Sequence, residues 1–340
     1  MSIGKHLGEK KKAAGSGFTA EIYGDLEEFC LRKGKRIRPL MLLIAYLGYS
    51  GDRKKMKEVL RLASVLEMMH SFLLVQDDII DRARLRRGRE TMHLIMQRRY
   101  GGLTANDAIG TDIALVAADV LFSNALEIIS NAGIDLRIKN RFLKYFGETY
   151  EMTAWGQILD SMNTMPLHID PGALASLQIS TMKTAYYTMY YPMVMGYVLA
   201  GGGSSKEISA IRDFAIPLGR AFQVRDDMLG VFGEVDDLGK SADSDIIEGK
   251  LTLLIEYTLQ SLEGKQRRKF QSVFQKIRKK PRDCAYIRNE ILKSGALDRA
   301  RETFHELLAA SRDGAAGLAV CGEQRALLNG LIDSVAAVMV

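Results

Sequence analysis

The chain has 340 residues, of which 47% are hydrophobic and 26% charged, with only six prolines. This composition excludes disordered, fibrous and collagen-like proteins, and it leaves enough sequence for a large core in one domain or two. Forty-seven Lys and Arg against 41 Asp and Glu give a net charge of +6, a mild excess compatible with nucleic acid, anionic lipid or phosphorylated small molecules.

The cysteine content and the length of the apolar runs indicate the cellular compartment of the protein. The three cysteines, Cys30, Cys284 and Cys321, are too few and too scattered for a disulfide framework, and no spacing suggests a zinc site. No apolar run approaches the roughly 18 residues that span a bilayer. The N-terminus lacks the apolar stretch of a signal peptide. We therefore expect a cytoplasmic protein with no transmembrane segment.

Helical spacing of apolar residues runs through most of the chain, and no clear strand alternation is visible. Residues 57–82 are apolar on nearly every side, as in a helix buried inside a bundle. Further helical segments are expected at about 104–131, 139–164, 172–200 and 206–233, and residues 264–340 continue the pattern without chemistry that we can identify. The Gly and Ser breaks between helices are short, which favours antiparallel neighbours. The prediction is an all-α fold without an interdomain linker.

The first acidic motif, QDDIIDR, ends the apolar helix expected at 57–82. Asp77 and Asp81 are four residues apart and share one helix face, where like charges repel unless a cation lies between them. Oxygen ligands without nearby cysteine select a hard divalent ion, and magnesium carried with a phosphorylated substrate fits best. Read alone, the motif could equally be a solvated helix end.

The same design recurs about 150 residues later, where Asp226 and Asp227 follow a second apolar helix. Basic residues follow each acidic pair, namely Arg86 and Arg87 after the first, and Lys240 and Lys250 after the second. A further basic motif, GKRIRP at 34–39, precedes another apolar segment. Two such pairs predict a polyphosphate held between facing helices through metal ions.

Together, these motifs resemble those of the all-trans isoprenyl (polyprenyl) diphosphate synthases. The similarity covers about 34–254 and includes, in the family's order, GKRIRP, EMMHSFLLVQDDIID with RRG, GQILD, KTA, GRAFQVRDD, GK and DIIEGK. It implies one all-α domain over 1–340, an isoprenoid synthase-type bundle around a deep central cavity, with C-terminal helices in 255–340 and a homodimeric assembly. It also implies magnesium-assisted loss of diphosphate from an allylic substrate, attack by isopentenyl diphosphate on the carbocation, and proton loss.

The resemblance also assigns roles to matching positions. Two or three magnesium ions would be bound by Asp77, Asp81 and Asp226, supported by Asp78, Asp227, Gln157 and Asp160. The allylic diphosphate would contact Arg86, Lys183, Lys240 and Lys250, with Thr184 and Gln223 lining the reaction centre. Isopentenyl diphosphate, held without metal, would contact Lys35, Arg38, His70 and Arg87. The released diphosphate would take the proton, so no side chain is expected to act as general base.

One position departs from the family pattern. The second acidic motif usually reads D-D-x-x-D, but its fifth residue here is Gly230. Glycine removes a carboxylate and, inside a helix, costs roughly 1 kcal/mol relative to alanine. Because the first aspartate is the direct ligand in the family, we expect activity to survive.

Product length is expected to depend on the helix that precedes Asp77. Phe72 lies five residues earlier, about 7.5 Å along the axis at about 1.5 Å per residue, which is deep enough for a cavity floor. Leu73 lies beside it and Met69 lies beyond it. A single aromatic residue there resembles family members that stop at twenty carbons. Geranylgeranyl diphosphate, made from dimethylallyl, geranyl or farnesyl diphosphate, is therefore the leading product and farnesyl diphosphate the second, although Phe72 could also be an ordinary core residue.

Other functions are weighed against this one. A class I terpene cyclase would share the first acidic motif but would not need Lys35, Arg38 and Arg87 for a second diphosphate. A non-catalytic regulatory subunit of a two-protein synthase would have degraded aspartate motifs, an idea that Gly230 keeps open. Nucleic-acid binding has little support, because no basic stripe is interleaved with aromatic residues. The basic runs at 10–12 and 278–280 are expected to be solvated surface.

Overall fold

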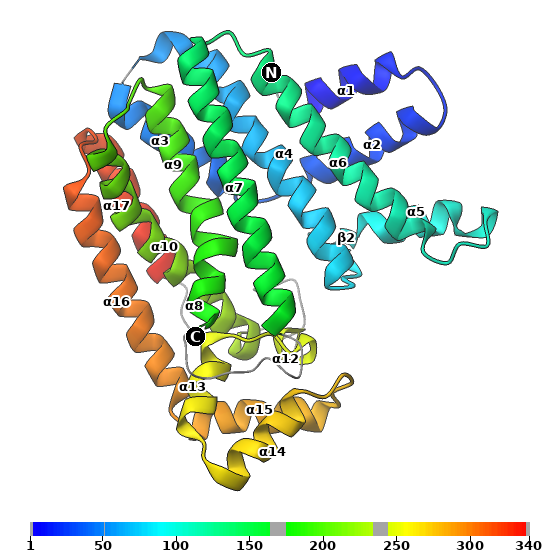
Figure 1. Cartoon of the computed structure of the whole chain (residues 1–340), viewed down its shortest axis with the longest axis vertical. Coiled ribbons are helices and arrows are strands. Elements are labelled where there is room, and N and C mark those ends of the chain that lie inside the picture. The colour runs from blue at the N-terminus through cyan, green and yellow to red at the C-terminus, as the bar shows by residue number, and fades with distance from the viewer. Residues whose placement is uncertain (1–2, 51, 164–174, 234–243, 338–340) are drawn as a thin grey trace. The chain divides into compact units, whose positions relative to one another are not determined.

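The computed structural model describes residues 3–50, 52–163, 175–233 and 244–337, and these are almost entirely helical (Figure 1). The chain divides into two compact units, one formed by Met1–Lys144 with Val198–Gly201 and the other by Tyr145–Tyr197 with Gly202–Val340. The predicted all-α class is confirmed. The organisation as one domain stays a prediction.

The first unit is built around the long helix α4 (Met56–Ile80), which contacts α3 (Ile37–Ser50), α5 (Met92–Tyr100) and α6 (Ile109–Ser130). Most of α4 is buried or half-buried, as its apolar sequence predicted. The unit also contains α1 (Ile3–Ala13), α2 (Phe18–Leu31), the 3₁₀ turns η1 (Arg53–Lys55) and η2 (Gly101–Leu103), and the beginning of α7 (Leu136–Asn163).

The end of α4 is a Schellman motif formed without glycine. Arg82 has a φ of +52°, and its N–H donates to the carbonyl of Ile79 at 3.2 Å. The N–H of Ala83 donates to the carbonyl of Asp78 at 2.9 Å, which completes the motif. A non-glycine residue in this left-handed region costs about 1 to 2 kcal/mol. The chain therefore leaves the helix in a fixed direction immediately after the first acidic motif.

A two-residue hairpin follows and places Arg86 and Arg87. Strand β1 (Leu85–Arg86) pairs antiparallel with β2 (Arg89–Glu90). Between the strands, Arg87 has a φ of +56° and Gly88 a φ of +75°, as a type I′ turn requires. These strands leave no signal in the sequence, because two residues are too few to show an alternating pattern.

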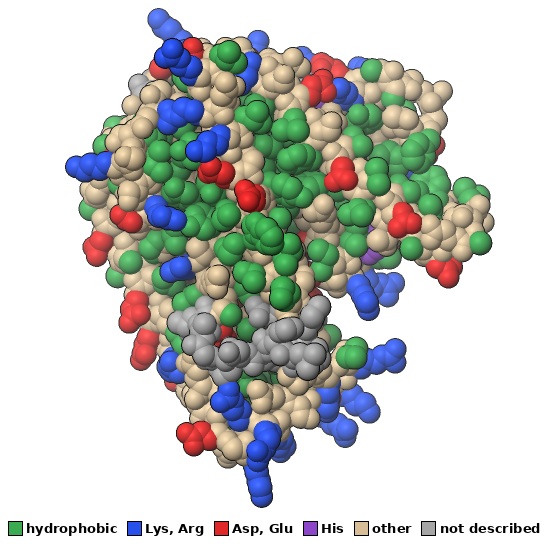
Figure 2. Space-filling view, in the orientation of Figure 1, with side chains coloured by type: hydrophobic (Ala, Val, Ile, Leu, Met, Phe, Trp, Pro, Cys, Tyr) green, Lys and Arg blue, Asp and Glu red, His purple; other side chains and the backbone are tan. Residues whose placement is uncertain are grey.

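The second unit is built around α10 (Ser205–Phe232), which contacts α16 (Ala296–Gly317) and the π-helical segment η3 (Ser180–Tyr190). The unit also contains the rest of α7. Its other helices are α8 (Ala175–Ile179), α9 (Tyr191–Leu199), α12 (Ser244–Glu248), α13 (Leu253–Ser261), α14 (Gly264–Phe274), α15 (Pro281–Lys293) and α17 (Gly322–Ala336). On the face shown in Figure 2, Lys and Arg side chains gather over α14 and α15.

Two glycines allow helices of the second unit to approach η3 closely. A Cβ on Gly156 of α7 would lie 2.5 Å from the backbone nitrogen of Lys183, and a Cβ on Gly219 of α10 would lie 2.4 Å from Cα of Ala185. These are the glycines of GQILD and GRAFQVRDD, and the residues that they contact belong to KTA. Three of the sequence motifs therefore meet at η3, and π-helical segments are frequently found at functional sites.

Helix α6 is the one described helix that is long and apolar enough to cross a membrane by length and composition. This is weak evidence, because the core helix of a soluble protein meets the same criterion, and 44% of the apolar window is buried inside the protein. Asp112, Asp119 and Glu127 interrupt the apolar sequence of this helix, so it does not form one continuous apolar run.

Candidate active site

Three carboxylates and Arg86 gather at the end of α4. Asp78 is fully buried and accepts a hydrogen bond of 2.7 Å from Nε of Arg86, whose Nη2 lies 3.5 Å from Oδ2 of Asp77. The N–H of Asp81 donates to the carbonyl of Asp77 at 2.8 Å, which keeps Asp81 one helical turn beyond Asp77. Asp77 is 23% exposed and Asp81 is half-buried. Asp78 therefore pairs with Arg86, while the side chains of Asp77 and Asp81 stay partly exposed.

Positive charge gathers around His70, in the middle of the same unit. Nη2 of Arg87 lies 3.4 Å from Nε2 of His70, and Nη1 of Arg87 donates to the carbonyl of Arg32 at 3.1 Å. Burial, followed by the positive charges of Arg38 and Arg87, lowers the pKa of His70 well below its usual range, so the imidazole is neutral at physiological pH. Burial also lowers the pKa of Arg87. An anion bound here would stabilise this crowded positive charge.

The loop before α3 holds these cations in place. A Cβ on Gly34 would lie only 2.7 Å from Nη2 of Arg87, so the glycine leaves the space that this guanidinium fills. Arg36, with a φ of +50°, pairs with the buried Glu67 of α4 and donates to the backbone carbonyls of residues 30 and 32. Lys35 is exposed beside it. The Arg36–Glu67 pair was missed in the sequence, because nothing local marks two residues 31 apart as partners.

Phe72 lies inside the first unit, with 2% of its surface exposed. Its ring centroid is 5.3 Å from that of Phe122 on α6, with an interplanar angle of 42°. Met69 is fully buried and Leu73 is half-buried. The predicted floor residue is therefore one member of an aromatic pair, whose other member comes from a helix about 50 residues further along the chain.

A polar network in the second unit joins η3, α10 and Lys250. Thr184 Oγ1 donates to Gln223 Oε1 at 2.8 Å, and Gln223 Nε2 donates to Asp227 Oδ1 at 2.8 Å. Nζ of Lys250 lies 3.6 Å from the same Asp227 oxygen. Burial raises the pKa of Asp227 to about 6. Asp227 is therefore an internal partner of two other predicted site residues.

Lys183 and Asp226 complete the described part of this group. Nζ of Lys183 donates to Oδ2 of the buried Asp160 at 2.8 Å. The side chain of Asp226 is 40% exposed and accepts a 2.8 Å hydrogen bond from Nη2 of Arg225. A small cavity of about 40 Å³ is lined by Asp160, Lys183, Thr184, Gln223, Asp227 and Lys250. The structure thus brings together Lys183, Thr184, Gln223 and Lys250 with the buried Asp160 and Asp227, and Asp226 adjoins Asp227 in sequence. Arg86, assigned to the same diphosphate, belongs to the other unit, and Gln157 donates to Ser161 Oγ at 3.4 Å within α7. Lys240 lies outside the described residues.

The space beside Gly230 is filled by another carboxylate. A Cβ built on Gly230 would lie 2.4 Å from Oδ2 of Asp245 in α12. The negative charge of Asp245 is also near enough to contribute to the raised pKa of Asp227. The backbone carbonyl of Asp245 accepts a 3.0 Å hydrogen bond from the N–H of Lys250. Asp245 is the first residue of the DIIEGK motif, and no sequence pattern predicted its position beside Gly230 of the other motif.

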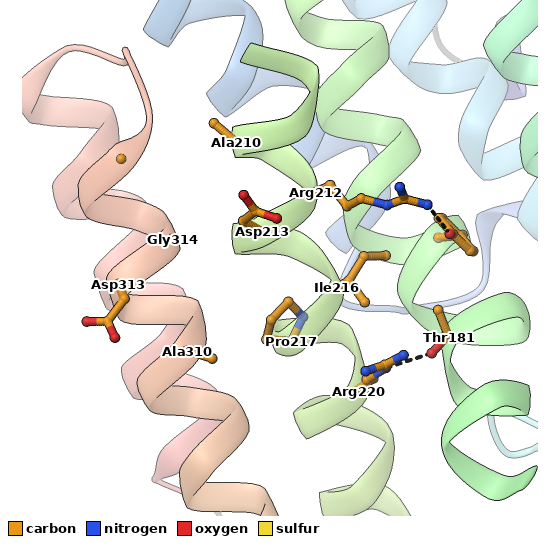
Figure 3. A pocket seen from close by; sticks show the side chains of 12 residues that line it. Thr181, Ala210, Arg212, Asp213, Ile216, Pro217, Arg220, Ala310, Asp313 and Gly314 are labelled. Carbon is orange, nitrogen blue, oxygen red and sulfur yellow. Dashed lines mark hydrogen bonds between the residues drawn. The ribbon is translucent and has the colours of Figure 1, made fainter. Parts of the chain in front are cut away.

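A larger groove of about 770 Å³ runs along α10, α16 and η3 (Figure 3). In it, Arg212 donates to the hydroxyl of Tyr186 and Arg220 to the hydroxyl of Thr181, both at 2.7 Å. None of the residues that the sequence marked for diphosphate or metal chemistry lines this groove. We therefore place the candidate site at the acidic and basic groups described above.

The carboxylates suit a metal that arrives with its substrate. Within the described ranges, no group of three or more His, Cys, Asp or Glu side chains is arranged to hold a metal ion by itself. Magnesium is usually bound through only one or two carboxylates, and substrate phosphates and water supply its other ligands. Asp77 with Asp81, and Asp226, are donor sets of this kind.

Partly exposed carboxylates near the ends of two helices, with cations paired to buried aspartates beside them, are features of a helical enzyme that binds phosphorylated substrates together with a divalent metal. The model of the polyprenyl synthetase family matches residues 20–291, and the chain belongs to this family. It is therefore a prenyltransferase of the trans-isoprenyl diphosphate synthase class, whose members use a divalent metal and isoprenyl diphosphate substrates.

Similar proteins differ in product. A short chain isoprenyl diphosphate synthase of Methanothermobacter thermautotrophicus is 31% identical over 240 residues, which cover 71% of this chain and 67% of that protein. A geranylfarnesyl diphosphate synthase of Aeropyrum pernix is 30% identical over 304 residues, covering 88% and 89%. The crystal structure of geranylgeranyl pyrophosphate synthase from Corynebacterium glutamicum, complexed with isoprenyl diphosphate and magnesium, superposes with a TM-score of 0.87 at 28% identity, covering 98% of this chain and 96% of that one.

Proposed function

We propose that this prenyltransferase condenses isopentenyl diphosphate with an allylic diphosphate, in the cytoplasm, and releases geranylgeranyl diphosphate. The observation that carries the product length is the contact between the buried Phe72 and the half-buried Phe122. Phe72 precedes Asp77 by five residues, or about 7.5 Å of helix. A chain growing along α4 from a diphosphate held at Asp77 meets these rings before it can reach Met69. Farnesyl diphosphate remains the second candidate.

The partly exposed carboxylates are proposed to hold magnesium. Asp77, Asp81 and Asp226 would supply oxygen ligands to two or three ions. When bound, these ions neutralise the charge that develops on the departing diphosphate. Because position 230 is glycine, this set of carboxylates has one member fewer than the family pattern. The side chain of Asp245 on α12 lies against Gly230 of α10 and supplies a carboxylate there. We therefore assign Asp245 to the metal side, as the replacement for the residue absent at 230.

The cations proposed to bind the allylic diphosphate share one structural device. Arg86 is held by Asp78, Lys183 by Asp160 and Lys250 by Asp227, and each of these aspartates is buried. A buried carboxylate needs a cation or several hydrogen bonds, so each aspartate fixes the direction of one cation. The remaining donors can then bond to phosphate oxygens without reorganisation. Lys240 is proposed to join them.

Isopentenyl diphosphate is proposed to bind at the cation cluster around His70, through Lys35, Arg38 and Arg87. The neutral imidazole can donate one hydrogen bond while the guanidinium groups supply charge and paired donors. Glu67, beside this cluster, is buried and paired with Arg36. The cluster therefore suits a diphosphate that carries no metal.

We also propose a homodimer that buries one side of α6. Leu115 and Leu126 are 44% and 38% exposed and lie about three turns apart on one side of the helix, with Val116 beside them at 62%. Burial against a second copy would remove this apolar stripe from water. Size-exclusion chromatography with light scattering should give twice the chain mass, and Leu115→Glu should reduce it to one. A native monomer at micromolar concentration would contradict the proposal.

A single assay addresses the reaction. The purified chain is incubated with labelled isopentenyl diphosphate, magnesium and each of dimethylallyl, geranyl and farnesyl diphosphate, and product length is measured. We expect a twenty-carbon product. A fifteen-carbon end product would replace geranylgeranyl with farnesyl diphosphate. No turnover with any primer would favour a regulatory subunit, and loss of diphosphate from one primer without added isopentenyl diphosphate would favour a terpene cyclase.

A further inference from the structure

A basic segment, defined here as residues 264–282, contains no residue of the proposed reaction. It spans α14, the following loop and the start of α15, and it holds nine cations and no carboxylate: Lys265, Arg267, Arg268, Lys269, Lys276, Arg278, Lys279, Lys280 and Arg282. Its formal charge is +9 in a chain whose total is +6, which leaves −3 for the other 321 residues. The excess positive charge of the protein is therefore located in this one segment.

These charges lie on the surface rather than inside the unit. Seven of the nine side chains are exposed, and Figure 2 shows Lys and Arg gathered over this region. Phe270 and Phe274 of α14 are buried and stack with their ring centroids 6.1 Å apart, which fixes the opposite, basic side of the helix toward solvent. Within the described residues, the one ion pair made by this segment joins Lys276 to Asp283. The other exposed cations are available to an anionic partner.

A large apolar side chain projects from the middle of these charges. Ile277 is 93% exposed, more than any other large hydrophobic side chain among the described residues, and it lies between Lys276 and Arg278. The loop around it is fixed, because Nζ of Lys279 donates to the carbonyls of Lys276 at 3.1 Å and Ile247 at 3.3 Å and lies over the ring of Phe274. Insertion into an apolar environment would remove this side chain from water, which is favourable.

We propose that the basic segment docks the enzyme on the surface of an anionic lipid bilayer, with the cations at the headgroups and Ile277 entering the interface. Polybasic surfaces with an apolar residue among the charges bind such membranes through electrostatic attraction to the headgroups and through burial of the apolar side chain. Single-stranded nucleic acid would also be attracted by +9, but it requires exposed aromatic rings for stacking, and both phenylalanines of this segment are buried. The proposal is independent of the reaction assigned above.

The test measures binding of the full chain to vesicles of phosphatidylcholine with and without phosphatidylglycerol, by co-sedimentation at low and high salt. Binding should require phosphatidylglycerol and weaken with salt. Each Lys or Arg near an anionic surface contributes about 1 kcal/mol, or about fivefold, so the double variant Arg278→Gln with Lys280→Gln should bind roughly 25-fold more weakly. Ile277→Ser should weaken binding several-fold without changing net charge. Turnover in the same preparations should be unchanged, and far-ultraviolet circular dichroism checks that each variant is folded.

The matched control removes two exposed cations from the other unit, Lys11→Gln with Lys12→Gln, which gives the same net charge. This variant should bind vesicles as the native chain does. If both double variants lost vesicle binding equally, binding would depend on net charge alone, and the proposal would be overturned. Vesicle binding that is insensitive to Ile277→Ser, together with tighter binding to a single-stranded oligonucleotide, would assign the segment to nucleic acid and also overturn it.

Discussion

Restoring the missing aspartate of the second acidic motif is expected to harm the enzyme. In Gly230→Asp, the new Cβ would lie 2.4 Å from Oδ2 and 3.0 Å from Cγ of Asp245, well inside van der Waals contact. The variant would also add a negative charge near the buried Asp227, whose pKa burial has already raised. Overpacking of this kind costs about 1 to 3 kcal/mol. Replacing a glycine inside a helix stabilises the folded state by at most about 1 kcal/mol, which is less than most of this overpacking cost. The free energy of unfolding should therefore fall.

The exchange variant distinguishes this reasoning from a general effect of mutation. Asp245→Ala alone removes a carboxylate from the metal side, for which an effect of about 10-fold to 100-fold on metal affinity is typical of such supporting groups. Gly230→Asp combined with Asp245→Ala restores one carboxylate and removes the clash. The double variant should therefore be more active and more stable than Gly230→Asp, with a favourable coupling of about 1 to 3 kcal/mol.

Two measurements report on this coupling. The first is the midpoint of turnover as a function of magnesium concentration, and the second is the magnesium-dependent rise in melting temperature with inorganic pyrophosphate, which needs no turnover. Gly330→Asp is the matched control, because Gly330 is also helical and a Cβ there meets nothing within 4 Å. If Gly230→Asp alone tightened magnesium binding, or if the two substitutions were simply additive, Asp245 would not be the replacement.

Four further predictions follow from the first unit. Phe72→Ala should lengthen the product, as measured by chromatography of the dephosphorylated chains. An unchanged product in a folded variant would mean that Phe72 is an ordinary core residue. Asp77→Ala or Asp81→Ala should nearly abolish turnover while leaving the melting temperature within a few degrees, and near-normal rates with excess magnesium would contradict a metal role. Gly34→Ala should displace the guanidinium that lies against it and raise KM for isopentenyl diphosphate but not for the allylic primer. Burial depresses the folded-state pKa of His70, so below about pH 6.5 the unfolded chain binds a proton there that the folded chain does not, and stability falls with pH. From about pH 6.5 to 5.5 the native chain should lose about 1 kcal/mol of unfolding free energy, and His70→Gln should not, as followed by urea denaturation.

The long helices were predictable because burial leaves a record in the spacing of apolar residues. Helix α4 was expected at 57–82 and lies at Met56–Ile80, since nearly all its sides pack against other elements. Its ending was not predictable. Arg82 and Arg87 have positive φ, where glycine is the usual signal, and the hairpin formed by β1 and β2 is shorter than any pattern that sequence periodicity can detect. The direction in which Arg86 points therefore had to come from the structure.

The site was predictable as a set of residue types but not as a set of partners. Carboxylates and cations could be assigned to diphosphate chemistry from their motifs. The pairs Arg36–Glu67 and Gly230–Asp245, by contrast, join residues that are 31 and 15 positions apart. No helical or strand repeat links such positions. Contacts of this kind depend on how elements pack, which a single sequence does not encode locally.

The two adjacent aspartates that begin each acidic motif have different surroundings for a geometric reason. Consecutive residues on an α-helix point about 100° apart, so a helix that packs on one side cannot present both carboxylates to a ligand. In α4 the side chain of Asp77 is 23% exposed and that of Asp78 is fully buried. In α10 the corresponding values are 40% for Asp226 and 6% for Asp227.

This geometry separates the two roles. Desolvation makes the second carboxylate of each pair dependent on a cation, and the cation it holds is Arg86 in one unit and Lys250 in the other. The first carboxylate keeps its access to a metal ion. Asp78→Asn should therefore free Arg86 and raise KM for the allylic diphosphate while leaving the magnesium midpoint nearly unchanged. The reverse pattern, a shifted magnesium midpoint with a normal KM, would make Asp78 a metal ligand and remove the separation of roles.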